Sequence, residues 1–379
     1  MLHQHEFDEN LQCAICKRRK KDIDFEYGMG FVRQPQQEQI IKKKENVMKG
    51  LDVGTSFIVL AKEEDDKIAY KDFRDAFYTI KPTTPVATKM IEKGLNGKVF
   101  VKDEDGSFIL LGYDAIEKAI ERNDTAKRPM FRGVVSPKEK HAKKVLAFIL
   151  KEVAGEASEP GEKIVFCVPA QPVDQEDDDF DVGYHEDVVT AILASSGYDA
   201  RSINEAEALC YAELENDEYT GIGISCGAGM TNVCVMLNGE PTVMFSTTKS
   251  GDWIDRMSAI ATGETDSVVQ AEKENGGFVI GEPNENPVLS AVSSYYERLI
   301  DYTTKQLSAA LDGHKSLPKF KNPLTIVVAG GTSQAKGYIK HFEKKIKENG
   351  FPLNIKEVRH ASDPLHAVAK GCLIASKIL

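Results

Sequence analysis

The sequence predicts an α/β fold made of two similar halves that face each other across a cleft. Residues 50–61 read as two apolar strands joined by a tight, glycine-containing turn. The same arrangement returns about 170 residues later, at 221–237, and such a repeat indicates a duplicated fold. A third glycine-rich stretch, 326–337, runs from an apolar strand into the start of a helix.

The first turn has the composition of a phosphate-binding loop. Gly54 permits a close backbone turn, and the hydroxyls of Thr55 and Ser56 join backbone amides that together can cradle an anion. Asp52 stands just before this turn, where a carboxylate can hold a hydrated magnesium ion beside the phosphate. We therefore expect a phosphate site at 54–56 with Asp52 as a metal ligand.

Length and composition indicate a cytoplasmic globular protein. The chain has 379 residues, of which 41% are hydrophobic and 28% charged, and its net charge of −11 disfavours nucleic acid as a partner. No apolar run approaches the roughly 20 residues that span a bilayer, and no signal peptide opens the chain. Seven scattered cysteines fit buried thiols in a reducing compartment. Membrane contact is not indicated.

Residues 1–47 differ in composition and form a polar N-terminal extension. They contain Cys13 and Cys16 in a Cys-x-x-Cys pattern, two histidines and two short basic runs. Thiolates and imidazoles are common zinc ligands, but a second ligand pair at finger-like spacing is missing. We expect a flexible, solvated tail, with zinc at Cys13 and Cys16 as the alternative.

Short apolar segments separated by turn residues predict the other elements of the first half. Strands are expected at 67–70, 76–80, 99–102, 108–111 and 163–168, with a turn at 83–85. Helices are expected to open at Gly112 and to cover about 137–153 and 185–196. The acidic insertion 174–181 should form a mobile surface loop.

In the second half, a helix is expected to open within 203–211, after a short strand. Glu205 lies near its start, where a carboxylate interacts favourably with the helix dipole. A long amphipathic helix is expected at 291–311, and a helix should begin near Ser333 after the third glycine-rich stretch.

These motifs, in this order, resemble the actin, Hsp70 and sugar-kinase ATPase superfamily, and most nearly its bacterial actin-like proteins of the MreB and MamK type. The match covers about residues 48–379. It implies an α/β, two-lobed actin-like ATPase fold of duplicated ribonuclease H-like domains. The expected domains are 48–200 and 201–379.

The resemblance also implies roles for the glycine-rich stretches: two phosphate loops, followed by an adenosine loop at 326–332. Glu205 matches the acidic residue that places the attacking water, although Ala206 stands where the family keeps proline. The segment 264–274 resembles the helix beside the adenosine pocket. The implied nucleotide-binding residues are Gly54, Thr55, Ser56, Gly227, Ala228, Gly229, Thr231, Gly251, Lys273, Gly330, Gly331 and Thr332.

The second phosphate loop departs from the family at Ser225, where aspartate is usual. A serine hydroxyl can bind a metal-bound water but contributes no charge to a hard cation. Because phosphoryl transfer depends on charge neutralisation, this change should slow hydrolysis more than it weakens binding. We expect Ser225 to reach the metal only through water.

The resemblance therefore implies a protein that binds Mg-ATP between two lobes and assembles with itself into cytoskeletal filaments, with weak ATPase activity. Two alternatives stay open: a monomeric Hsp70-type switch that acts on a partner protein, and a nucleotide-binding scaffold without hydrolysis. Preference for ATP over GTP, the cellular process and the filament geometry are not fixed by the sequence.

Overall fold

The computed structural model describes residues 48–65, 67–175, 180–314 and 319–379. The extension 1–47, with the zinc alternative at Cys13 and Cys16, lies outside the described residues, as do residues 176–179 of the acidic insertion.

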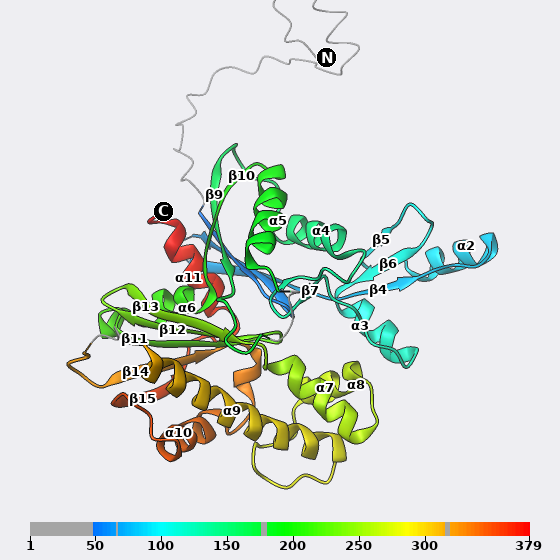
Figure 1. The fold of residues 1–379 in the computed structure, drawn as a ribbon. Helices are drawn as coiled ribbons and strands as arrows, with labels where there is room; N and C mark the ends of the chain where they lie inside the picture. The colour runs from blue at the N-terminus through cyan, green and yellow to red at the C-terminus, as the bar shows by residue number, and fades with distance from the viewer. Residues whose placement is uncertain (1–47, 66, 176–179, 315–318) are drawn as a thin grey trace, which may run out of the picture. The chain divides into compact units, whose positions relative to one another are not determined.

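Two five-stranded sheets form the framework of the described chain (Figure 1). The first contains β1 (Lys49–Val53), β2 (Phe57–Glu64), β3 (Lys67–Arg74), β9 (Glu162–Val168) and β10 (Tyr198–Asn204). The second contains β11 (Gly221–Cys226), β12 (Thr231–Leu237), β13 (Glu240–Thr247), β14 (Leu324–Ala329) and β15 (Ile355–His360).

The two sheets share one topology. Their strand orders are β10-β9-β1-β2-β3 and β13-β12-β11-β14-β15. In each, the glycine-containing hairpin and a third strand form an antiparallel meander, and two parallel strands extend the sheet from the first hairpin strand. This repeat confirms the expected duplicated, two-lobed α/β fold. The boundary expected after residue 200 falls within β10 (Tyr198–Asn204).

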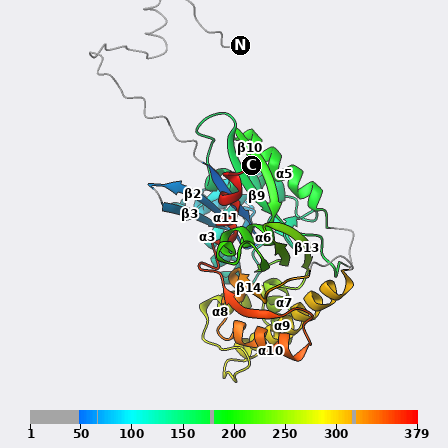
Figure 2. The ribbon, with the colours of Figure 1, turned by 90° about the vertical axis from the view of Figure 1, so that its left-hand side faces the viewer.

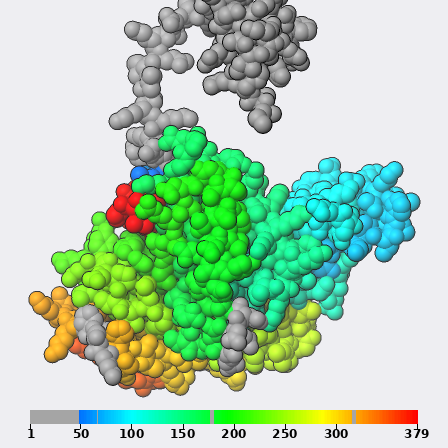
Figure 3. Space-filling view, turned by 45° about the horizontal axis from the view of Figure 1, so that its top comes forward, coloured from blue at the N-terminus to red at the C-terminus, as the bar shows by residue number. Residues whose placement is uncertain are grey.

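The first lobe carries a smaller sheet of β4 (Phe77–Ile80), β6 (Phe108–Leu111) and β5 (Phe100–Lys102), with α2 (Pro85–Gly94) and α3 (Gly112–Glu121). In Figure 3 these residues, in cyan, project at the right of the view. A short hairpin follows, β7 (Met130–Phe131) and β8 (Val134–Val135), and then α4 (Ala142–Ala154) and α5 (Val182–Ser195).

Two helices pack between the sheets: α6 (Glu205–Glu213) and α11 (Ala367–Ser376). Figure 2 shows α11 beside β9 and α6. The backbones come close because Gly371 lacks a side chain; a Cβ there would lie 1.8 Å from the carbonyl oxygen of Ala208. One buried cluster draws residues from both sheets and from these two helices, so the lobes share a core.

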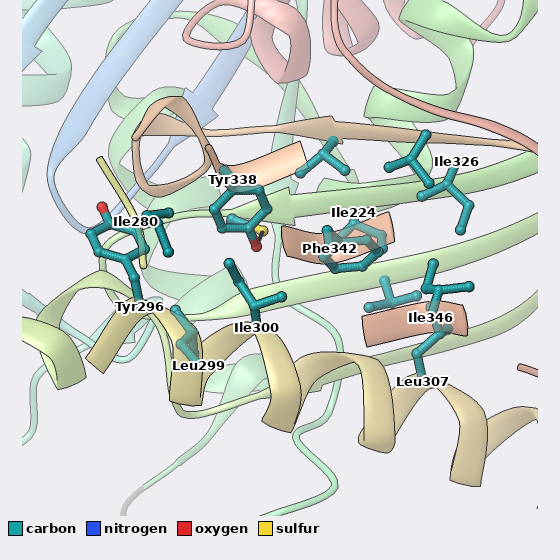
Figure 4. Packing of buried hydrophobic residues seen from close by; sticks show 14 of the residues in the cluster. Ile224, Ile280, Tyr296, Leu299, Ile300, Leu307, Ile326, Tyr338, Phe342 and Ile346 are labelled. Atoms are coloured by element: carbon teal, nitrogen blue, oxygen red, sulfur yellow. Dashed lines mark hydrogen bonds between the residues drawn. The ribbon is translucent and has the colours of Figure 1, made fainter. Parts of the chain in front are cut away.

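The second lobe is completed by α7 (Gly251–Thr262), α8 (Asp266–Asn275), α9 (Pro287–Gly313) and α10 (Tyr338–Glu348). Figure 4 shows Leu299 and Leu307 of α9 and Phe342 of α10 facing Ile224 and Ile326 of the sheet. Burial of this apolar stripe is the main source of stability for an amphipathic helix.

Three local expectations need correction. Pro85 begins α2 rather than a turn, because the side chain of Thr84 caps the helix by accepting from the amide of Ala87 (3.1 Å). The helix expected from 137 begins at Ala142, where the apolar periodicity begins. A short 3₁₀ helix, η2 (Gly331–Gln334), precedes α10, which begins only at Tyr338. None of the helices in the described part of the chain is long and apolar enough to cross a membrane.

Candidate functional site

A cavity of about 490 Å³ lies between the two lobes, and both glycine-rich turns and the third glycine-rich stretch line it. Its volume is in the range usual for small-molecule sites. The residues singled out in the sequence that line it are Asp52, Gly54, Thr55, Ser56, Glu205, Ser225, Gly227, Ala228, Gly229, Lys273, Gly330, Gly331 and Thr332.

The turns of the two lobes touch at Gly229. A Cβ at this position would lie 2.4 Å from the hydroxyl oxygen of Thr55 and 3.0 Å from the amide nitrogen of Gly133. The same hydroxyl of Thr55 accepts a hydrogen bond from Gly133 (3.0 Å). The absence of a side chain at 229 therefore allows the phosphate-type turns of both lobes to approach across the cavity.

The third glycine-rich stretch packs against and hydrogen-bonds to the second glycine-rich turn, at residues 226–229. Gly330 has φ +88°, and a Cβ there would lie 2.3 Å from the carbonyl oxygen of Cys226, so glycine is required on both grounds. Thr332 donates its hydroxyl hydrogen to the carbonyl of Gly227 (2.8 Å). The three stretches thus form one continuous wall of the cavity.

Thr231 and Gly251 do not line the cavity; they lie behind the second turn. The hydroxyl of Thr231 donates to the carbonyl oxygen of Lys249 and to the hydroxyl of Ser250 (3.3 and 3.1 Å). Ser250 and the amide of Gly251 both donate to the carbonyl of Gly227 (2.6 and 3.3 Å). The structure places these residues as supports of the loop.

Glu205 is the first residue of α6 and points its carboxylate into the site. Asn204 caps the helix, its side-chain oxygen accepting from the amides of Ala206 and Glu207 (3.0 and 3.3 Å). Both carboxylate oxygens of Glu205 accept hydrogen bonds, one from the hydroxyl of Ser225 (2.6 Å) and one from the amide of Asn232 (2.9 Å).

Asp52 and Glu205, two of the acidic residues that line the cavity, are both costly to ionise there. Burial raises the pKa of Glu205 to about 8; the negative charge of Asp52 adds to this rise, and the hydrogen bond from Ser225 opposes it. Burial likewise raises the pKa of Asp52 to about 6, opposed by a hydrogen bond from the thiol of Cys167 (3.2 Å). A cation between these groups would relieve both costs.

The residues present fit a magnesium ion carried in with a nucleotide. Magnesium binds through one or two carboxylates together with water and phosphate oxygens, rather than through a cage of protein ligands. Asp52 supplies such a carboxylate and Ser225 a neutral hydroxyl. Over the described residues, no group of three His, Cys, Asp or Glu side chains forms a metal site.

Lys273 lines the cavity from α8, but its ammonium group is paired. It lies 2.7 Å from Asp255 and 3.4 Å from the carbonyl of Gly251. Burial raises the pKa of Asp255 to about 6, and Lys273 opposes this rise. The lysine thus joins the start of α7 to the cavity wall.

Sequence reasoning missed Asn232, Gln270, Phe278 and Tyr296. The last three line the cavity from α8, α9 and the segment between them; Gln270 falls within the segment 264–274 that the resemblance placed beside the adenosine pocket, whereas no local motif marks Phe278 or Tyr296. Asn232 could have been found from the hairpin register, since it stands directly opposite Ser225 in the β11–β12 pair.

Comparison with solved structures identifies the fold. The chain is similar to a MamK double helical filament structure (TM-score 0.63, 18% identity, 88% of this chain and 99% of that chain). MreB5 of Spiroplasma citri bound to AMPPNP gives a TM-score of 0.62 at 15% identity, over 88% of this chain and 97% of that chain. EutJ, an ethanolamine utilization protein from Carboxydothermus hydrogenoformans, gives 0.52 at 12%, over 90% and 92%.

No curated protein matches the chain significantly. The family model described as Volactin matches residues 47–376, which is nearly all of the two-lobed region. The fold is that of the MamK and MreB5 structures. The chain belongs to the Volactin family.

Proposed function

We propose that this protein binds Mg-ATP in the cavity between its lobes, hydrolyses it slowly and assembles with its own copies into cytoplasmic filaments. The observation that carries the proposal is the convergence of both glycine-rich turns, the third glycine-rich stretch and the carboxylates of Asp52 and Glu205 on one cavity. The MamK structure is a double helical filament and the MreB5 structure has AMPPNP bound, and both support the proposal by analogy of fold.

Within this proposal, the turns at 54–56 and 227–229 hold the phosphates by their amides and hydroxyls. The stretch 330–332 faces the nucleoside. Asp52 holds the magnesium ion, which neutralises phosphate charge, and Ser225 reaches it through water. The twelve nucleotide-binding residues deduced from the sequence thus remain our proposed set, with Thr231 and Gly251 acting from behind the loop.

Glu205 orients the attacking water. The water oxygen bonds to the γ-phosphorus as the bond from that phosphorus to the β–γ bridging oxygen breaks, and the proton lost by water passes to the Glu205 carboxylate. Burial holds the pKa of that carboxyl above its ordinary value, and Ser225 supplies no charge to the metal. Both features favour slow turnover.

The decisive experiment combines pelleting and negative-stain microscopy with phosphate release, in the presence of Mg-ATP, Mg-ADP or no nucleotide. Filaments that appear with Mg-ATP, together with slow phosphate release, are the expected result. Soluble protein with brisk phosphate release would instead favour a monomeric switch. Bound ATP with neither polymer nor phosphate would favour the scaffold, for which Ser225 is the supporting observation.

A further inference from the structure

Asn232 is a fully buried polar residue whose side chain joins two parts of the site. It lies on β12, directly opposite Ser225 of β11, so both side chains project toward the start of α6. Both side chains donate a hydrogen bond to Glu205, which is their shared partner.

The orientation of the Asn232 amide is fixed by its neighbours. Its side-chain oxygen accepts from the backbone amide of Ala170, 2.9 Å away, just beyond the end of β9. Because that partner is an obligatory donor, the oxygen must face it, and the NH₂ group must face Glu205. The amide then donates to Oε2 of Glu205 (2.9 Å) while Ser225 donates to Oε1 (2.6 Å).

Glu205 needs such support. A glutamate side chain has several rotatable bonds, and the negative charge of Asp52 opposes a second carboxylate at this place. Two donors from adjacent strands, one per oxygen, fix both the position and the plane of the carboxylate. Each oxygen keeps a lone pair with which to accept from water.

We propose that Asn232 is the positioning residue that aims Glu205 at the attacking water. This inference rests on the ATP hydrolysis proposed above. Asn232 touches no substrate itself; it acts through the Glu205 carboxylate, and its bond to Ala170 ties that carboxylate to the end of β9 in the first lobe.

Two substitutions separate positioning from a structural role. Asn232→Asp keeps the oxygen that accepts from Ala170 but replaces the donor to Glu205 by a carboxylate oxygen, which repels it. Asn232→Ala removes both bonds. Misplacing a catalytic group can cost about 10²-fold in rate, so we expect both variants to lower kcat for phosphate release by about 10- to 100-fold. ATP affinity, measured by equilibrium binding, should stay within about 3-fold, because Asn232 is not one of the residues that line the cavity.

Asn96→Asp is the matched control, because Asn96 is exposed and the change adds the same charge. Its kcat should equal that of the unchanged protein. The near-isosteric Asn232→Asp keeps the test usable even where Asn232→Ala fails to fold, and melting temperatures report on folding for every variant.

A double-mutant cycle with Glu205→Gln completes the test. If Asn232 acts only through Glu205, Asn232→Ala should cause no further loss of kcat in the Glu205→Gln background. An equal loss in both backgrounds would overturn the inference, as would a wild-type rate for Asn232→Asp. A wild-type rate for Glu205→Gln would refute the role of Glu205 itself. If Glu205→Gln is inactive while Asn232→Asp is normal, only the role of Asn232 fails.

Discussion

The hydroxyl of Ser225 lies 2.6 Å from a carboxylate oxygen of Glu205, to which it donates a hydrogen bond. At this place in the loop, the actin-like pattern would put an aspartate, whose carboxylate would repel Glu205 rather than bond to it. At position 225 the site therefore has a hydrogen bond to Glu205 in place of a second negative charge. Its neutral hydroxyl stabilises the Glu205 carboxylate but leaves Asp52 as the main negative partner for a metal.

Ser225→Asp should reverse this exchange. The added carboxylate gives a hard cation a second charged ligand, so the Mg²⁺ concentration for half-maximal nucleotide binding should fall about 10-fold. Without Mg²⁺ the variant should melt at a lower temperature, because three buried carboxylates then repel one another. Ser225→Asn is the neutral control. A Mg²⁺ dependence identical to that of the unchanged protein would contradict our placement of the metal.

Gly229→Ala should weaken nucleotide binding, because the added methyl group would force apart the turns of the two lobes, which touch at this position. The new methyl group would lie 2.4 Å from the Thr55 hydroxyl, and such overpacking typically costs about 1–3 kcal/mol, which corresponds to roughly 5- to 160-fold in affinity. Gly94→Ala is the control, since a Cβ there meets nothing within 4 Å. Equilibrium binding of a fluorescent ATP analogue measures the nucleotide affinity of both variants. Equal affinities would show that the lobes need not approach here.

Arg128 joins the lobes outside the cavity, its guanidinium donating to both carboxylate oxygens of Asp252 (2.7 and 2.8 Å). Burial raises the pKa of the nearby Asp75 carboxyl well above its ordinary value, and the positive charge of Arg128 opposes this rise. Arg128→Ala should therefore lower the free energy of unfolding by about 1–3 kcal/mol, as expected for a charged hydrogen bond. Lys305→Ala, which breaks an exposed pair with Asp301, should cost less than about 1 kcal/mol. Urea titrations measure the free energy of unfolding of both variants, and equal losses in the two would contradict the prediction.

His185 should make the fold sensitive to mild acid. Its ring is fully buried, neither ring nitrogen has a hydrogen-bond partner among the described residues, and burial lowers its pKa to about 4. Between the ordinary value of 6.5 and about 4, the unfolded chain binds the proton that the folded chain rejects. Stability should therefore fall as pH falls through this window, by about 3 kcal/mol in total.

Thermal melts of the His185→Leu variant between pH 7 and pH 4.5 test this. The variant should lose less stability on acidification than the unchanged protein, whereas replacement of the exposed His314 should leave the pH profile as it was. Parallel pH profiles for the unchanged protein and the His185 variant would assign acid sensitivity to other groups.

Local residue patterns were sufficient to predict the two hairpins and the third glycine-rich stretch, whereas the role of Glu205 was implied by the resemblance and stays a prediction. A glycine-rich turn between apolar strands is a local signal, because backbone freedom and anion-binding amides depend on a few adjacent residues. The order of these signals was enough to infer the duplicated, two-lobed fold. Thr84 and Pro85 are likewise a local signal, since a threonine cap followed by proline favours a helix start over the expected turn.

Only the tertiary structure decided which side chains from segments distant in sequence become partners. Strand pairing set Asn232 opposite Ser225, and the packing of α6 brought Glu205 to both of them. The pairing of Lys273 with Asp255 likewise depends on how α7 meets α8. Hydrogen bonds and burial costs act through space over a few ångströms. A side chain's partner is therefore fixed by the fold as a whole, whereas its turn or strand preference is fixed by its neighbours in the chain.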